Sequence, residues 1–298
     1  MTVRTLDRSP DLRPVYVRVV AYGLLRRVGL LGRHEQLPDV VLVLEDVVPD
    51  AGQLAAYRRV CGFAEGGPVP ATFSHVLSFP LSLDLMTDRS FPLPLTGLVH
   101  VRNTLTQYRE VDPTERLTVL VHAEDLRPHD KGVQFDMVSE VRAGDEPVWH
   151  QVSTYLHRQG GSGRSGSAGR GLSRGSDDGS PEPRWEEVTR FGVDASVSPR
   201  YAGMSGDRNP HHLHPLLAKV FGFRSMPAHG MWTKARALAG LADRLPPRFT
   251  VTGSFERPLL LPARVVLAVA EDGDPRPYAL FDEERDKPYL TGTVDTRS

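Results

Sequence analysis

The 298-residue chain is long enough for one large domain or two modest ones, each with its own hydrophobic core. One cysteine, Cys61, excludes a framework of internal disulfides and is typical of a reducing compartment, so we expect a cytoplasmic protein. The formal net charge of −1 argues against a nucleic-acid-binding protein that relies on net positive charge.

Residues 1–37 form an N-terminal extension that we expect to be helical. Its apolar part, residues 15–31, is interrupted by Arg18, Arg26 and Arg27, so it offers neither the core of an export signal nor a run of about 20 apolar residues. We therefore expect no integral membrane segment. A short amphipathic helix packed on the body of the protein is the main interpretation, and loose association with a membrane surface is the alternative.

Residues 38–157 have the pattern of a unit in which helices precede a sheet. A short apolar run predicts a buried strand, two longer segments predict helices, and four segments rich in Val, Leu, Thr and aromatic residues predict strands. In chain order we expect a strand at 40–44, helices at 53–60 and 73–86, and strands at 98–108, 117–123, 133–141 and 148–156.

The composition changes at residues 158–184, which are mostly Gly, Ser and Arg and predict a flexible linker. Beyond it, in residues 185–298, the order of elements recurs. We expect a strand at 188–193, helices at 200–204 and 230–245, and strands at 249–255, 265–270, 279–282 and 289–294. A long helix followed by an antiparallel sheet, twice, indicates an internal duplication in an α+β fold.

An alignment of the two halves by eye shows where they differ. It places residues 57–63 over 201–207, and residues 69–71 over 226–228. Phe63 then occupies the position of Asp207. Six residues separate Phe63 from Pro70, whereas nineteen separate Asp207 from Pro227. The second half carries an extra segment and the first half lacks the carboxylate, so we expect chemistry in the second half only.

The extra segment concentrates polar side chains. Asp207, Asn209 and three histidines lie within eight residues, beside Pro210, which can turn the chain so that some of these side chains converge. A carboxylate and an imidazole in one site can divide proton transfer, one removing a proton and the other delivering it. Hydration of an enoyl thioester requires both acts.

This segment resembles the signature of the MaoC-like, type 2 (R)-specific enoyl-thioester hydratases and 3-hydroxyacyl-thioester dehydratases. That signature runs Tyr, Ser-Gly-Asp, any residue, Asn-Pro, an aliphatic residue, His, then Gly-Phe and a later Ala-His-Gly-Met. The matching residues are Tyr201, Ser205, Gly206, Asp207, Asn209, Pro210, His212, Gly222, Phe223, Ala228, His229, Gly230 and Met231. Two positions depart from it, since His211 replaces the usual aliphatic residue and His214 the usual acidic or amide residue.

The resemblance covers about residues 38–294 and implies a double hot dog fold, in which two tandem halves each wrap a long helix in an antiparallel sheet. Residues 38–157 would be a degenerate hot dog half and residues 185–298 the catalytic half. The implied activity is the reversible conversion of a (3R)-3-hydroxyacyl thioester to a trans-2-enoyl thioester and water, in fatty acid metabolism. The carrier, coenzyme A or acyl carrier protein, and the physiological direction stay open. We expect a monomeric pseudo-dimer or a homodimer.

The resemblance also implies roles for individual residues. Asp207, the principal base, and His212, its partner acid and base, would hold one water. Asn209 would orient that water or brace the loop, and Ser205 would support the loop. The backbone N–H of Gly230 would meet the thioester oxygen, a role that the start of a helix suits on physical grounds alone. No cofactor is implied.

Several alternatives remain at this stage. A hot dog thioesterase would attack the carbonyl carbon but would usually lack this Asp-x-Asn-Pro-x-His pattern, and a non-catalytic acyl-binding subunit would have lost Asp207 and His212. Zinc binding by His211, His212 and His214 has neither a nearby cysteine nor a recognised spacing in its favour, so we expect no metal.

Two further expectations concern the substrate. Five basic residues are candidates for phosphate contacts at the entrance, with scattered surface charge as the alternative: Arg200, Arg208, Lys219, Arg224 and Lys234. The second helix of the first half is apolar and could form a trough for medium or long acyl chains, lined by Phe73, Val76, Leu77, Phe79, Leu81 and Leu85.

Overall fold

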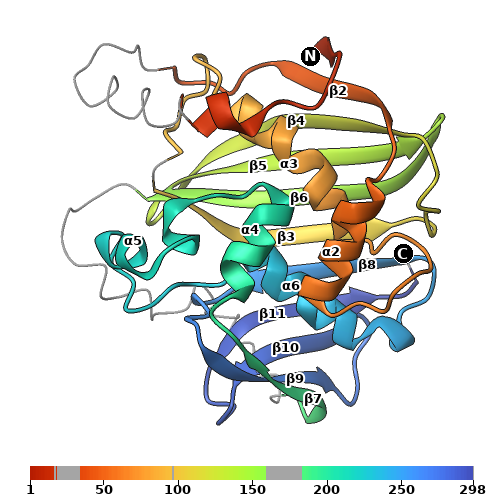
Figure 1. Ribbon diagram of the computed structural model, residues 1–298, viewed down its shortest axis with the longest axis vertical. Helices are drawn as coiled ribbons and strands as arrows, with labels where there is room; N and C mark the ends of the chain where they lie inside the picture. The colour runs from red at the N-terminus through yellow and green to blue at the C-terminus, as the bar shows by residue number, and fades with distance from the viewer. Residues whose placement is uncertain (17, 19–33, 96, 159–182, 298) are drawn as a thin grey trace.

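The computed structural model describes residues 1–16, 18, 34–95, 97–158 and 183–297 (Figure 1). Within these ranges one sheet of 11 strands runs through the molecule in the order β1-β2-β4-β5-β6-β3-β8-β11-β10-β9-β7. The helices lie against one face of that sheet (Figure 1). None of the helices in the described ranges is long and apolar enough to cross a membrane.

The first half contributes two helices and the strands from β2 to β6. The helices are α2 (Ala51–Cys61) and α3 (Phe73–Met86). The strands are β2 (Val40–Val47), β3 (Leu98–Gln107), β4 (Leu117–His129), β5 (Gly132–Ala143) and β6 (Glu146–Arg158). Asp50 caps α2 by accepting from the N–H of Gln53, and Gly62 ends it with a left-handed φ of 82°.

The second half repeats this order and adds three short helical elements. Its helical elements are α4 (Val197–Ser205), η1 (Pro210–His212), α5 (Pro215–Val220), α6 (Gly230–Gly240) and η2 (Ala242–Arg244). Its strands are β7 (Trp185–Val193), β8 (Phe249–Phe255), β9 (Ala263–Ala270), β10 (Arg276–Asp282) and β11 (Pro288–Asp295). The sequence did not indicate η1 and α5, because both are too short to show a helical period.

The strand order is the same in both directions from the centre of the sheet. One side runs β3-β6-β5-β4-β2, and the other runs β8-β11-β10-β9-β7, which are the corresponding strands of the second half. The halves join where β3 pairs antiparallel with β8, with Leu105 opposite Val251. Both of these residues are fully buried, so the seam lies in the hydrophobic core. The expected α+β fold of two tandem halves is confirmed.

The N-terminal extension differs from the expected helix. It begins with β1 (Thr2–Leu6), which pairs in parallel with β2, because β2 would otherwise leave a free edge and because Thr and Val favour strands. Residues 12–16 are helical, and Val15 is buried. Most of the apolar stretch at 15–31 and nearly all of the expected linker at 158–184 lie outside the described residues.

Candidate active site

The turn after α4 determines where Asp207 lies. Gly206 ends the helix with a left-handed φ of 79°, a conformation that favours glycine, and Asp207 follows directly. Its backbone N–H donates to Ser205 Oγ at 3.2 Å. Its Oδ1 accepts from the side-chain amide of Asn209 at 3.0 Å and from the backbone N–H of that residue at 3.3 Å. Ser205 and Asn209 therefore both hold the loop that carries the carboxylate.

Tyr16 of the N-terminal extension holds the same loop from outside. Its hydroxyl donates to the carbonyl of Gly206 at 2.9 Å and accepts from the N–H of Arg208 at 2.6 Å. These two backbone groups lie on either side of Asp207. Burial, and then the nearby Asp207 charge, raise the pKa of Tyr16, so its hydroxyl keeps the proton that it donates. Tyr16 contacts a loop 190 residues away, and the sequence offered no signal for this contact.

His212 is buried beside this loop and is held as a neutral ring. Its Nδ1 donates to the carbonyl of Pro227 at 2.8 Å, which leaves the lone pair of Nε2 available. Burial, and then the neighbouring His229, lower the pKa of His212 well below its usual range. At neutral pH its Nε2 is therefore a hydrogen-bond acceptor and a potential base.

His229, the histidine of the Ala-His-Gly-Met part of the signature, contacts both of these residues. Its Nε2 donates to the backbone carbonyl of Asp207 at 3.0 Å and lies 3.9 Å from the carboxylate. Its ring stacks on His212, with 3.7 Å between centroids and 23° between planes. Burial lowers its pKa to about 3. His229 therefore fixes the positions of Asp207 and His212 relative to each other.

Asp207, His212 and His229 each offer one possible metal-ligand atom, and these atoms lie within 4.8 Å of one another, so a metal site must be considered. An imidazole binds a metal through a lone pair in the plane of its ring. The rings of His212 and His229 are nearly parallel and stacked, so an ion between their nitrogens would lie far out of both planes. His214 caps α5 by accepting from the N–H of Leu216, and it is exposed. The donor set suits a water molecule better than zinc.

Gly230 begins α6 next to this group. His229, the residue that caps the helix, makes no side-chain bond to its first turn, so the first N–H groups are open to a ligand. A Cβ at Gly230 would come within 3.2 Å of the ring of Phe255, which shows how close the neighbouring surface lies. The residue is only partly buried. An oxyanion can therefore reach the positive end of the α6 dipole here.

Two expectations about the surroundings are wrong. Lys234 cannot contact a phosphate at the entrance, because it is fully buried and donates to the carbonyls of Asn103 and Val251, each at 3.1 Å. The expected apolar trough on α3 is also closed. Five of its six side chains are packed in the core with at most 6% of their surface exposed, namely Phe73, Val76, Phe79, Leu81 and Leu85.

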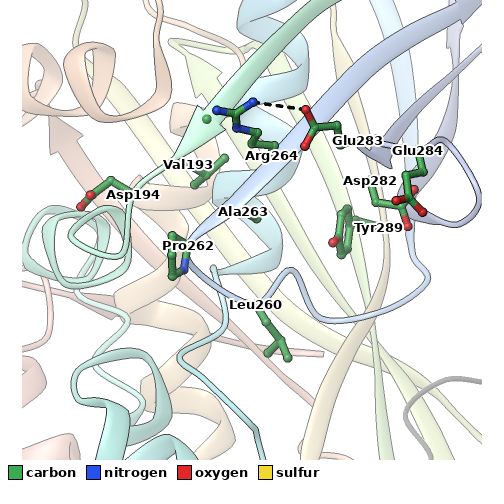
Figure 2. A pocket seen from close by; sticks show the side chains of 11 residues that line it. Val193, Asp194, Leu260, Pro262, Ala263, Arg264, Asp282, Glu283, Glu284 and Tyr289 are labelled. Carbon is green, nitrogen blue, oxygen red and sulfur yellow. Dashed lines mark hydrogen bonds and ion pairs between the residues drawn. The ribbon is translucent and has the colours of Figure 1, made fainter.

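A separate groove of about 760 Å³ lies among β7, β9 and the β10–β11 turn (Figure 2). Its lining includes the carboxylates of Asp194, Asp282, Glu283 and Glu284, and Glu283 pairs with Arg264 at 3.3 Å. None of the predicted site residues lines it. An acidic groove disfavours the phosphates of an acyl carrier, so we place the candidate site at Asp207.

Comparisons with known proteins identify the family. A family model for the MaoC like domain matches residues 181–273. The 3-hydroxyacyl-thioester dehydratase X of Mycobacterium tuberculosis is 36% identical over 269 residues, which cover 88% of this chain and 91% of that protein. The crystal structure of HtdX from the same organism superposes with a TM-score of 0.72 at 34% identity, over 86% of this chain and 99% of that chain. A conserved hypothetical protein of M. tuberculosis with a double hotdog fold superposes with a TM-score of 0.54 at 13% identity, over 89% and 96% of the two chains, which is a likeness of fold alone.

The fold and the polar site in its second half define a double hot dog protein of the acyl-thioester dehydratase class. The chain belongs to the family of MaoC-like dehydratases. The resemblance and the double hot dog architecture expected from the sequence are thereby confirmed.

Proposed function

We propose that this protein catalyses the reversible hydration and dehydration of acyl thioesters, converting a (3R)-3-hydroxyacyl thioester to a trans-2-enoyl thioester and water. One observation carries the proposal. Asp207 and His212 place acceptor atoms within 4.8 Å of each other, and the bond from His212 Nδ1 to Pro227 leaves Nε2 unprotonated. Both groups can therefore accept an O–H of the same water.

In the hydration direction, the bound water donates one O–H to Asp207 and the other to His212, so an oxygen lone pair faces C3 of the enoyl group. As the C3–O bond forms, the water gives a proton to the pair, with Asp207 as the principal base and His212 as its partner. The negative charge moves to the thioester oxygen, beside the N–H of Gly230 at the start of α6. The proton returns from the pair to C2 on the same face, which is syn addition, and dehydration is the reverse.

The remaining parts of the proposal concern assembly and setting. We take residues 38–157 as the degenerate half and residues 185–298 as the catalytic half, with the substrate carried as an acyl-CoA or acyl-carrier-protein thioester. Because β3 and β8 already join two hot dog halves within one chain, a monomeric pseudo-dimer supplies what two single hot dog chains would. A homodimer is the alternative. We place the protein in the cytoplasm, where a single buried cysteine suits a reducing compartment.

The direct experiment is an assay of the purified chain with crotonyl and longer trans-2-enoyl thioesters, on both coenzyme A and acyl carrier protein. We expect loss of the enoyl absorbance and formation of the (3R)-hydroxy product without release of free thiol. Release of thiol with no hydroxyacyl product would instead identify a thioesterase. Binding of the thioester without any turnover would identify a non-catalytic acyl-binding subunit.

A further inference from the structure

Polar side chains of the first half extend the candidate site into the fold. His75 and Ser74 lie on α3, and His100, Gln151 and Tyr155 lie on β3 and β6, which are adjacent in the sheet. The proposed mechanism uses none of them. We call these five residues, together with Tyr201 of α4, the inner polar group.

Four members of the inner polar group, Gln151, His75, His100 and Tyr155, form a continuous chain of contacts. The amide nitrogen of Gln151 lies 3.1 Å from His75 Nδ1. The ring of His75 stacks on that of His100 at 6.1 Å, and His100 stacks on Tyr155 at 4.7 Å. The Asp207 charge raises the pKa of Tyr155, after the larger effect of burial, and it acts on Tyr201 in the same sense. The group therefore extends from Gln151 to the neighbourhood of the proposed base.

Phe255 connects the same group to the other side of the reaction centre. Its ring lies 4.9 Å from that of His100 and faces Gly230, where a Cβ would come within 3.2 Å. A thioester with its oxygen at Gly230 and C3 at Asp207 would thus have the inner polar group beside the next part of its acyl chain. His100, Tyr155 and Phe255 are only partly buried, so accessible space remains beside their rings.

Four polar atoms of this group are buried without a hydrogen-bond partner in the described part of the chain: Ser74 Oγ, His100 Nε2, Gln151 Oε1 and Tyr201 Oη. A buried polar atom without a partner destabilises a fold, and such atoms are rare in native proteins. Of these, Gln151 and His100 are joined through His75, and the ring of Tyr201 lies 5.0 Å from that of His229 in the candidate site. This pattern indicates a ligand group that supplies the missing bonds.

Two of these atoms define the chemistry of that ligand group. Gln151 uses its amide nitrogen toward His75, so its free Oε1 is an acceptor. Burial keeps His100 neutral by lowering its pKa, and its ring also interacts with the backbone of Arg102, which leaves Nε2 as an acceptor. Acceptors require a donor, and an acyl chain carries a donor most simply as a hydroxyl group.

We propose that the inner polar group binds a hydroxyl group on the acyl chain beyond C3, so that the preferred substrates are hydroxylated acyl thioesters and not plain alkyl ones. Its single O–H donates to His100 Nε2 or to Gln151 Oε1, depending on the carbon that carries it, and the Tyr201 hydroxyl donates to its oxygen. This inference rests on the proposed function for the position of C2 and C3. Gln151 and Tyr201 are as buried as the apolar side chains of α3, but the inner polar group also includes the partly exposed His100 and Tyr155, through which a ligand can approach.

The test compares trans-2-enoyl-CoA thioesters of one length, about ten carbons, that are either plain or carry one hydroxyl at successive carbons beyond C4. We expect kcat/KM to rise at least about tenfold over the plain chain when the hydroxyl is at the matching carbon. Either His100→Phe or Gln151→Leu, whichever removes the acceptor of the O–H, should abolish this preference while the plain chain is still turned over. His157→Phe is the matched control. It lies on β6, the strand of Gln151, and should keep the preference.

Binding of the corresponding saturated acyl-CoA thioesters, measured by calorimetry, makes the result independent of turnover. If no hydroxyl position improves kcat/KM or binding, the inference is wrong, while turnover of the plain chain still supports the proposed function. If hydroxylated chains bind more tightly but no enoyl thioester is hydrated, the inner polar group stands and the hydratase proposal fails. A preference that survives both His100→Phe and Gln151→Leu would also overturn the inference. A variant that fails to fold would show a lowered Tm. In that case the wild-type chain decides whether the inference holds, through the ratio of its affinities for the hydroxylated and the plain acyl-CoA.

Discussion

The two halves of the chain share a backbone plan and differ at two decisive positions. Tyr57 and Tyr201 are both buried, with ring centroids 6.4 Å apart, and their helices both end at a left-handed glycine, Gly62 or Gly206. Phe63 follows the first glycine and Asp207 the second. The helices that correspond in the alignment, α3 and α6, begin at Phe73 and at Gly230. The first half therefore blocks with phenylalanine the two points at which the second half offers a carboxylate and an open N–H.

The loops that follow the two glycines are also held differently. In the first half the buried Arg58 guanidinium donates to the carbonyls of Ala64, Gly67 and Pro68 at 3.0, 2.8 and 2.7 Å. In the second half Tyr16 holds the loop through Gly206 and Arg208. One arrangement serves stability and the other positions a carboxylate. The same turn therefore stabilises the fold in the first half and positions a carboxylate in the second.

The largest expected difference between the halves in activity comes from His212, which has no counterpart in the first half. We expect His212→Ala to lower kcat by roughly 10²-fold or more, the range for a general acid–base group, because Nε2 no longer holds the water. Steady-state kinetics on an enoyl thioester measures it. His214→Ala is the control and should stay near wild type, since His214 caps α5. Near-normal turnover of His212→Ala would mean that the second half does its chemistry without the imidazole.

The next effect tests whether Tyr16 belongs to the site. Tyr16→Phe removes both hydrogen bonds to the Asp207 loop, so we expect kcat to fall about tenfold with little change in KM. Tyr108→Phe is the matched control. Tyr108 directly follows the last residue of β3, Gln107, and its substitution should leave kcat unchanged. If Tyr16→Phe only lowers the Tm and kcat is kept, the extension merely stabilises the fold.

Arg58 should show the opposite behaviour. Arg58→Met removes three hydrogen bonds from a buried guanidinium to the loop, so we expect the free energy of unfolding to fall by about 3 kcal/mol, at about 1 kcal/mol for each lost bond. Denaturant unfolding measures this loss, and kcat at low temperature should be unchanged. A fall in kcat without a loss of stability would contradict the division between the two loops.

The smallest effect is a dependence of stability on pH that both halves share. Burial lowers the pKa of His75 from 6.5 to about 4 and that of His229 to about 3. As the pH falls below 6.5, the unfolded chain takes up protons that the folded chain refuses, so stability decreases until the pH reaches these folded pKa values. Each histidine contributes about 1.4 kcal/mol per pH unit. In unfolding experiments between pH 6.5 and about pH 5, His75→Gln should reduce this slope, whereas the exposed His34→Gln should not.

The sequence predicted the fold better than the surroundings of the site. The bounds of α3 and β8 were predicted to the residue, because both are apolar or alternating runs with clear turns at their ends. The duplication followed from the order of such runs, and Asp207 and His212 followed from a compact motif. The motif could not show that His229 stacks on His212 or that Tyr16 reaches Gly206, since both contacts depend on packing between distant segments.

The first half was misjudged for a related reason. The apolar residues of α3 predict a lining, but a mostly apolar helix is as easily part of the core, and most of these side chains are buried. Two polar residues that the fold brings together, His75 and His100, come from different elements and carry no shared spacing in the sequence. Only the pairing of β3 with β6 and the packing of α3 bring them together.

The central claim is that a single pair in the second half, Asp207 with His212, activates the water. The most direct test is Asp207→Asn, which keeps the shape of the side chain and its bonds to Asn209 while removing the base. We expect kcat for hydration of a trans-2-enoyl thioester to fall roughly 10²-fold or more, while binding of a substrate analogue, at one per chain, is unchanged. Turnover near the wild-type value, or two analogues tightly bound per chain, would contradict it.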